Sequence, residues 1–278
     1  FSRNKTIMCN TFKNFMGYDS KSALDNINNI GDLAGRFLND ADNFLDNKNS
    51  VGIASTDGTV VNGSATGNKI EVKESSSVGI FAKLTENAPF PFQAILNKGL
   101  ITLNGGSTKT SSVGIYSLIE DKAVQAGKTQ TIANNGTINV GTKSSAGIYI
   151  NDNRTKGDDI TSFIKNEGTI NVTEESSAGI IGEYSQITNG NPLTKNEVIE
   201  LSAKKTAGII ANPKSEVINY GTIKTVPNPT NTGIVGVAAL NGAVIKNYGN
   251  IIIDGASNAG IYVLPKGKVE GATPTATN

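Results

Sequence analysis

The sequence offers few side chains that could carry out covalent or metal chemistry. It contains no histidine and no tryptophan, and Cys9 is its single cysteine. Histidine general bases, Ser-His-Asp triads and metal sites built on imidazole or on several thiolates are therefore excluded. With 25 Lys and Arg against 24 Asp and Glu, the net charge of +1 gives no electrostatic reason to expect a nucleic acid or an anionic membrane as the partner.

The carboxylates could support acid–base chemistry or bind calcium only if they were clustered. Glu174–Glu175 is an adjacent pair, whose side chains diverge on a strand. The segment Asn151-Asp152-Asn153-Arg154, followed by Gly157-Asp158-Asp159, is rich in oxygen ligands. Its spacing matches neither an EF-hand nor the nonapeptide repeat of calcium β-rolls. We expect no catalytic residue, no metal and no cofactor, and keep a polysaccharide-acting enzyme as a remote alternative.

Non-covalent binding is better supported, because bulky apolar residues recur at one position, directly after a repeated Gly-Ile pair. The series consists of Phe81, Tyr116, Tyr149, Ile181, Ile210, Val235 and Tyr262. If these positions stack, they form an apolar and aromatic stripe that could bind protein, or sugar rings that stack on aromatics. Alternatively, long loops or a helix cover the stripe.

An internal repeat is what would stack these residues. The Gly-Ile pair occurs eight times, with glycines at positions 52, 79, 114, 147, 179, 208, 233 and 260. A second phrase, apolar-x-Asn-x-Gly-x-apolar-x-apolar, lies between several copies. Its asparagines are Asn97, Asn134, Asn166, Asn219 and Asn247. Alternation with a period of two residues, together with β-branched side chains, predicts short strands with one buried face.

Units of 25–35 residues cannot bury such a face alone, so the copies must stack. We predict an all-β chain folded as a parallel β-helix, a solenoid of about eight coils in which each strand pairs in parallel with its equivalent one coil along. The asparagines then point inward, where single amides would be costly. Stacked amides can bond one another, so we expect an asparagine ladder.

The first 49 residues depart from the repeat. Apolar residues recur at spacings of three and four between Asp19 and Asp46, which predicts an amphipathic helix interrupted near Gly31 or Gly35. We expect residues 1–49 to form an N-terminal α-helical segment that caps or packs against the solenoid, or contacts a partner, and residues 50–278 to form the β-helix. No apolar run of ~18 residues predicts a transmembrane helix. The start at Phe1 leads us to expect a piece of a longer chain.

Loops are the other place where binding could occur. Four long excursions are expected side by side at one corner, namely residues 83–94, 118–131, 151–162 and 185–196. The first contains Pro89-Phe90-Pro91-Phe92, a stiff segment that is either packed or held out as a contact. The candidate ligand-binding residues are Phe81, Phe90, Phe92, Tyr116, Tyr149, Asn151, Asp152, Arg154 and Tyr262.

Two stretches resemble the passenger regions of large type V autotransporter adhesins, most closely those of fusobacteria. Gly136–Tyr149 and Gly168–Ile181 carry the resemblance, which covers roughly residues 51–264. It implies a right-handed β-helix displayed outside the bacterial cell, in a parent protein anchored in the outer membrane through a C-terminal β-barrel. It also implies a role in virulence and cell adhesion, with a host-cell or bacterial surface glycan or protein as the partner.

The resemblance identifies the scaffold, and no binding residue of the family can be carried onto a position here. We therefore expect an adhesin segment at the cell surface that does not itself insert into a membrane. The alternative is a passive stalk or spacer.

Overall fold

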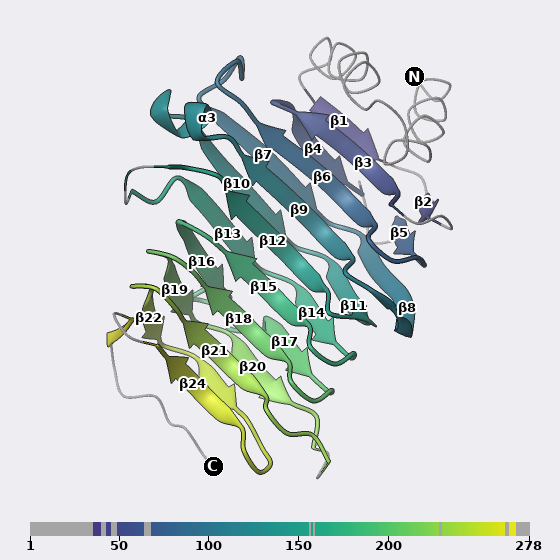
Figure 1. The fold of residues 1–278 in the computed structure, drawn as a ribbon, viewed down its shortest axis with the longest axis vertical. Coiled ribbons are helices and arrows are strands. Elements are labelled where there is room, and N and C mark those ends of the chain that lie inside the picture. Colours follow the sequence, from purple (N-terminus) through teal and green to yellow (C-terminus); the bar gives the residue numbers. More distant parts are fainter. Residues whose placement is uncertain are drawn as a thin grey trace.

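The computed structural model describes residues 36–39, 43–45, 49–63, 68–155, 157, 159–227, 230–264 and 267–270. These residues form three parallel sheets, named A, B and C, that run side by side along the long axis of the molecule (Figure 1). The chain passes from A to B to C in every coil, so each strand lies next to its equivalent from the coil before. The fold is the predicted parallel β-helix.

The bounds of the strands follow this three-sheet order. Sheet A contains β1 (Arg36–Asn39), β4 (Thr59–Asn62), β7 (Phe92–Asn97), β10 (Thr129–Asn134), β13 (Ser162–Asn166), β16 (Ser185–Asn189), β19 (Glu216–Asn219), β22 (Val244–Asn247) and β25 (Lys268–Glu270). Sheet B contains β2 (Asn43–Leu45), β5 (Lys69–Val72), β8 (Leu100–Thr110), β11 (Thr137–Lys143), β14 (Thr169–Val172), β17 (Val198–Leu201), β20 (Thr222–Thr225) and β23 (Asn250–Ile252). Sheet C contains β3 (Val51–Thr56), β6 (Val78–Leu84), β9 (Val113–Ile119), β12 (Ala146–Asp152), β15 (Ala178–Gly182), β18 (Ala207–Ala211), β21 (Val235–Ala239) and β24 (Ala259–Val263).

A short helix, α3 (Asp121–Gln125), lies in the connection between β9 and β10. Across the described ranges, no helix combines the length and the hydropathy needed to cross a membrane.

The core is a set of straight rows of aliphatic side chains. In sheet C, Ile115, Ile148 and Ile180 are in register on consecutive strands, and each is completely buried. Burying one such side chain contributes about 1.5–3 kcal/mol. Because every coil adds the same residues to the same rows, a chain that is poor in aromatics still builds a continuous core.

The predicted asparagine ladder is present and is longer than the sequence indicated. Each amide nitrogen donates to the amide oxygen one coil along, over distances of 2.7–2.8 Å. The members are Asn62, Asn97, Asn134, Asn166, Asn189, Asn219 and Asn247. The buried amides satisfy one another, so these residues belong to the scaffold.

The N-terminal helix prediction is wrong where the structure can test it. Arg36–Asn39 and Asn43–Leu45, which lie inside the predicted helix, form β1 and β2 and pair with β4 and β5. Backbone pairing with the next coil prevails there over the helical spacing of the apolar residues. Residues 1–35 and Cys9 lie outside the described residues.

One copy of the Gly-Ile pair was assigned wrongly. Ala207 pairs with Val235, and Ile209 pairs with Val237, so the equivalent glycine is Gly236 and not Gly233. Gly233 instead has a positive φ of 71° in the turn before the strand. Consequently Ala238, rather than Val235, occupies the position equivalent to Ile210.

The four long excursions do not all share one corner. Residues 83–94, 118–131 and 151–162 lead from sheet C to sheet A, as expected, but residues 185–196 contain β16 and lead from sheet A to sheet B. The first three do contact one another, since the Thr155 amide donates to Asp121 at 3.0 Å and Lys128 Nζ donates to the Ala88 carbonyl at 2.8 Å.

Candidate binding surface on sheet C

The outward side of sheet C carries the stripe that the repeat predicts. Strand register aligns one residue from each strand in a row that we call the outward column. Its members are Ala54, Phe81, Tyr116, Tyr149, Ile181, Ile210, Ala238 and Tyr262. The column is therefore aromatic over β6, β9 and β12, aliphatic over the next three strands, and aromatic again at β24.

The three aromatic rings at the start of the column contact one another. The ring centroids of Phe81 and Tyr116 are 5.6 Å apart, and those of Tyr116 and Tyr149 are 5.4 Å apart, with tilted planes. This spacing lies in the favourable range for aromatic pairs. The rings stabilise one another, and all three stay partly accessible to solvent.

A polar network holds the tyrosine hydroxyls. Asn151 Nδ2 donates to the Tyr116 hydroxyl at 3.1 Å, and the Tyr149 hydroxyl bonds to the Glu183 carboxylate. Burial, the nearby charge of Glu183 and the neighbouring Tyr116 raise the pKa of Tyr149 to about 12. Burial also raises the pKa of Glu183, and Asp152 opposes its ionisation further, although Glu183 accepts a 3.2 Å bond from the Asp152 amide.

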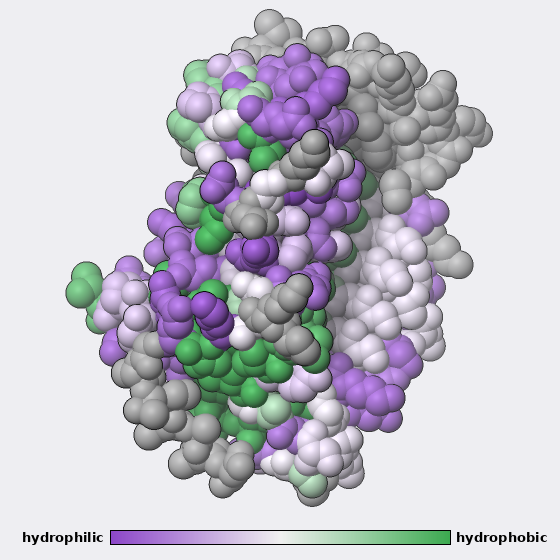
Figure 2. Space-filling model, turned by 60° about the vertical axis from the view of Figure 1, so that its left-hand side comes forward, coloured by the Kyte–Doolittle hydropathy of each residue, from purple (hydrophilic) through white to green (hydrophobic). Residues whose placement is uncertain are grey.

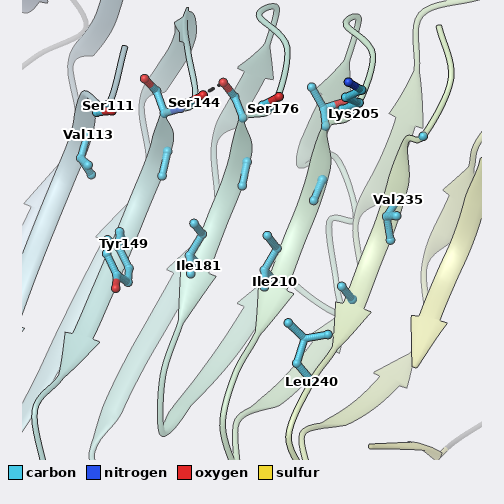
Figure 3. A pocket seen from close by; sticks show the side chains of 18 of the residues that line it. Ser111, Val113, Ser144, Tyr149, Ser176, Ile181, Lys205, Ile210, Val235 and Leu240 are labelled. Carbon is cyan, nitrogen blue, oxygen red and sulfur yellow. Dashed lines mark hydrogen bonds between the residues drawn. The ribbon is translucent and has the colours of Figure 1, made fainter. Parts of the chain in front are cut away.

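Beside the outward column runs a groove of about 630 Å³. Its floor is a row of small residues, which include Ala146, Ala178 and Ala207. Tyr149, Ile181 and Ile210 form one wall, and they follow one another from strand to strand with Leu240 further along (Figure 3). The groove brings Tyr149 and Tyr262, which the sequence predicted as site residues, into one surface.

The opposite wall is formed by the corner residues that precede each strand. Ser144, Ser176 and Lys205 adopt positive φ values of 54°, 59° and 57°, and their side chains are exposed. They lie at the strand starts, at the edge of the groove (Figure 3). The groove thus has an aliphatic floor, an apolar wall and a rim of hydroxyl groups with Lys205.

Sheets A and B present different chemistry to solvent. On sheet B, Asn171 donates to Asn139 at 2.8 Å, and Lys224 forms a 2.9 Å ion pair with Glu200. On sheet A, Glu216 accepts from Gln186 at 2.8 Å and forms an ion pair with Lys246. Hydrophobic residues gather over the C-terminal half of the molecule, below a largely hydrophilic area (Figure 2). Sheets A and B also leave apolar side chains accessible on their outward sides, such as Phe92 and Ile252. Only the outward face of sheet C lines the groove.

Two predicted site residues lie in the interior instead. The side chains of Asp152 and Arg154 are fully buried and form an ion pair, with Arg154 Nη2 2.5 Å from Asp152 Oδ2. Arg154 also donates to the Thr161 hydroxyl at 2.6 Å and lies 4.0 Å from the centre of the Tyr184 ring. These contacts fix the loop after β12, and neither charged group is accessible to a ligand.

Phe90 and Phe92 are exposed but lie apart from the groove. Their exposed fractions are 55% and 58%, and Phe92 begins β7 of sheet A. Lys128 holds the backbone of this loop through the carbonyls of Ala88 and Phe90. The structure therefore does not bring these two rings together with the tyrosines of sheet C.

Sequence reasoning missed Leu240, Leu264 and Lys205 as groove residues. Leu240 and Leu264 lie two positions after members of the outward column, so a period of two would have found them once Gly236 had been aligned correctly.

Within the described part of the chain, no three Asp, Glu, His or Cys residues are close enough to hold a metal ion.

The chain has no match among protein-family models, curated proteins or solved structures. Arguments about function therefore depend on the surface itself.

Proposed function

We propose that this chain is an adhesin segment displayed at a bacterial cell surface, which binds a partner macromolecule non-covalently through the outward face of sheet C. The observation that carries the proposal is the contrast between faces that share one backbone. Sheets A and B carry amide bonds and ion pairs on their outward sides, beside single exposed apolar residues such as Phe92 and Ile252, whereas sheet C arranges Ile181, Ile210 and Tyr262 along a groove. Extended apolar patches on soluble proteins often mark interaction sites.

The regular scaffold supports this proposal in a second way. Asparagine bonds and aliphatic rows repeat from coil to coil, so the outward side chains are held at fixed spacings on rigid strands. A preorganised surface loses little conformational entropy on binding. Display of many copies on one cell would convert individually weak contacts into avidity.

The experiment measures adhesion of beads coated with the chain to host epithelial cells and to bacteria. We expect saturable adhesion that Ile210→Lys abolishes, because a charge in the groove wall would have to be desolvated on binding. The control variant is Asn171→Lys, a matched charge on the outward side of sheet B. The absence of saturable adhesion, or equal losses in the two variants, would refute the proposal and favour a spacer.

A further inference from the structure

We propose that the partner bound by the outward face of sheet C is a second copy of this chain, related by a two-fold axis parallel to the long axis of the β-helix. The inference rests on the proposed function only in taking this face as the binding surface. A two-fold interface requires a surface that complements itself. The outward face of sheet C meets this requirement in shape, in polarity and in charge.

The shape argument concerns a ridge and the groove. From β12 to β24, the residues two positions after each member of the outward column form a third row, which we call the ridge. Backbone hydrogen bonds between neighbouring strands keep this row aligned. The amides of Asn212, Leu240 and Leu264 donate to the carbonyls of Gly182, Ala211 and Ala239, respectively. Its members are Asn151, Glu183, Asn212, Leu240 and Leu264. The ridge lies on the other side of the outward column from the small-residue floor, and its two leucines also line the groove, where Ala238 is the small member of the column.

The proposed axis runs above the outward column, parallel to the long axis of the β-helix. It places the ridge of each copy over the groove of the other copy, so that each strand faces the equivalent strand of its partner. Glu183 then faces Ala178, and Leu240 faces Val235. Larger side chains thus meet smaller ones along the face, and Ile181 and Ile210 meet their own copies. Packing larger side chains against smaller ones is how close-packed interfaces are filled.

The polarity argument concerns the direction along the axis. Over β12, β15 and β18 the ridge is polar, and the groove rim at these strands carries Ser144, Ser176 and Lys205. Over β21 the ridge residue is Leu240 and the rim residue is Gly233, whereas over β24 Leu264 meets the rim residue Ser257. Same-strand pairing therefore matches polar with polar over β12, β15 and β18, and apolar with apolar over β21. The alternative is a two-fold axis that is parallel to the strands and passes through β18. That axis would place Lys205 of one copy against Lys205 of the other, and Leu240 of one copy against Glu183 of the other.

The charge argument concerns Lys205 and Glu183. Among the described residues, neither has an ion-pair partner in its own chain, although nine other ion pairs are formed. They lie on opposite sides of the face, on neighbouring strands about 4.8 Å apart. The two-fold axis brings Lys205 of one copy toward Glu183 of the other, and it does so twice. Two unpaired charges of opposite sign thereby become two intermolecular pairs.

The pairing predicts a parallel dimer, in which both chains run in the same direction. The aromatic cluster of Phe81, Tyr116 and Tyr149 lies at one end of the paired region.

The test is sedimentation equilibrium of the chain over a range of concentrations, with two charge-reversed variants. We expect a reversible dimer for the wild type. Lys205→Glu and Glu183→Lys should each weaken it by at least about tenfold, because each variant creates two pairs of like charges. An equimolar mixture of the two variants should restore the dimer, because both intermolecular pairs then carry opposite charges. Lys204→Glu, on the neighbouring exposed lysine outside the groove, should leave dimerisation unchanged.

Circular dichroism and thermal unfolding of each variant establish that it folds, and the mixture provides a test that misfolding could not mimic. A wild-type chain that stays monomeric up to about 1 mM would overturn the inference. Dimers that neither variant weakens, or a mixture as weak as its components, would overturn the arrangement.

Bead adhesion separates this inference from the proposed function. Saturable, Ile210-dependent adhesion by a monomeric chain would keep the adhesin function and remove the pairing. Dimerisation restored by mixing, without adhesion to any cell, would keep the pairing and remove the adhesin function.

Discussion

The carbonyl oxygen of Gly179 lies 2.6 Å from the position that a Cβ atom at Gly147 would occupy. The same relationship repeats from strand to strand along sheet C, because each repeated glycine faces the backbone of the next coil. No side chain fits at that distance, so the requirement for glycine comes from the stacking of coils and not from a turn. This explains why the recurrent phrase always contains glycine at this position.

Substitution of Gly147 by alanine should therefore destabilise the chain strongly. The added methyl group would clash with a backbone carbonyl that cannot move without separating two strands, so we expect a loss of about 3 kcal/mol in the free energy of unfolding. The matched control is Gly260→Ala on the last strand, where a Cβ would meet only a side-chain atom at 3.4 Å. Urea unfolding should show little change for that variant, and equal losses at the two positions would contradict the stacking argument.

The asparagine ladder predicts a different kind of loss. Asn166 accepts from Asn134 and donates to Asn189. Asn166→Ala therefore leaves the buried Asn189 amide oxygen without its ladder donor, and it removes one of the two acceptors of the Asn134 amide nitrogen, which keeps the Gly136 carbonyl at 3.3 Å. We expect the free energy of unfolding to fall by about 3 kcal/mol. Asn171→Ala, which removes a single amide bond to Asn139 on the outward side of sheet B, should cost within about 1 kcal/mol. If the ladder contributed nothing to stability, Asn166→Ala and Asn171→Ala would unfold at the same urea midpoint, which would contradict the prediction.

The buried ion pair predicts that Arg154 acts on stability and not on binding. Arg154→Met leaves the buried Asp152 carboxylate without its partner, which typically costs about 3–5 kcal/mol. The double variant Asp152→Leu/Arg154→Met removes both charges and should recover part of that loss. Thermal unfolding measures both effects. If the double variant were as stable as the wild type but beads coated with it adhered less, the ion pair would contribute to binding, which would contradict this prediction.

Glu183 predicts a pH dependence. Its pKa is raised above the ordinary value of 4.5, mainly because burial disfavours the carboxylate. The folded chain therefore favours the protonated form, and stability falls as the pH rises from 4.5 through the raised pKa. Glu183→Gln cannot ionise, so its stability relative to the wild type should increase across that window and stay constant at higher pH.

Glu175 provides the control with the opposite sign. Hydrogen bonds from Lys143 and Lys204 lower its pKa below 4.5, so its contribution is present above pH 4.5 and is lost as the pH falls through the lowered pKa. Glu175→Gln should therefore be less stable than the wild type at neutral pH, and the difference should shrink in acid. Parallel pH profiles for the two variants would contradict the assigned shifts.

The fold could be predicted because its determinants are local and repeated. A period of two residues gives the strands, and the recurrence of Asn and Gly-Ile gives the register between coils. The limits appear where a phrase changes. Asn62 and Asn189 were missed because each is followed directly by glycine, whereas the phrase has one residue between. Gly233 was misassigned because a turn glycine happens to precede an isoleucine three residues before the true copy.

The candidate binding surface could be predicted only in part. The outward column follows from the register, so Tyr116 and Tyr149 were placed correctly relative to each other. Asp152 is the last residue of β12 and lies in its inward row, in register with Ile119, so its burial follows the period of two that was expected to end before residue 151. Arg154 lies in the loop beyond, where burial is not periodic. The groove depends on residues from three rows and on the corner residues, and such a combination cannot be seen in any single phrase.

Side-chain footprinting of the chain, free and bound to its partner, tests most directly whether the outward face of sheet C is the binding surface. The account predicts that Ile181, Ile210, Leu240 and Tyr262 lose reactivity on binding, while Thr188 on sheet A and Asn171 on sheet B keep theirs. Protection of the outward residues of sheet A or sheet B, with sheet C unchanged, would contradict it.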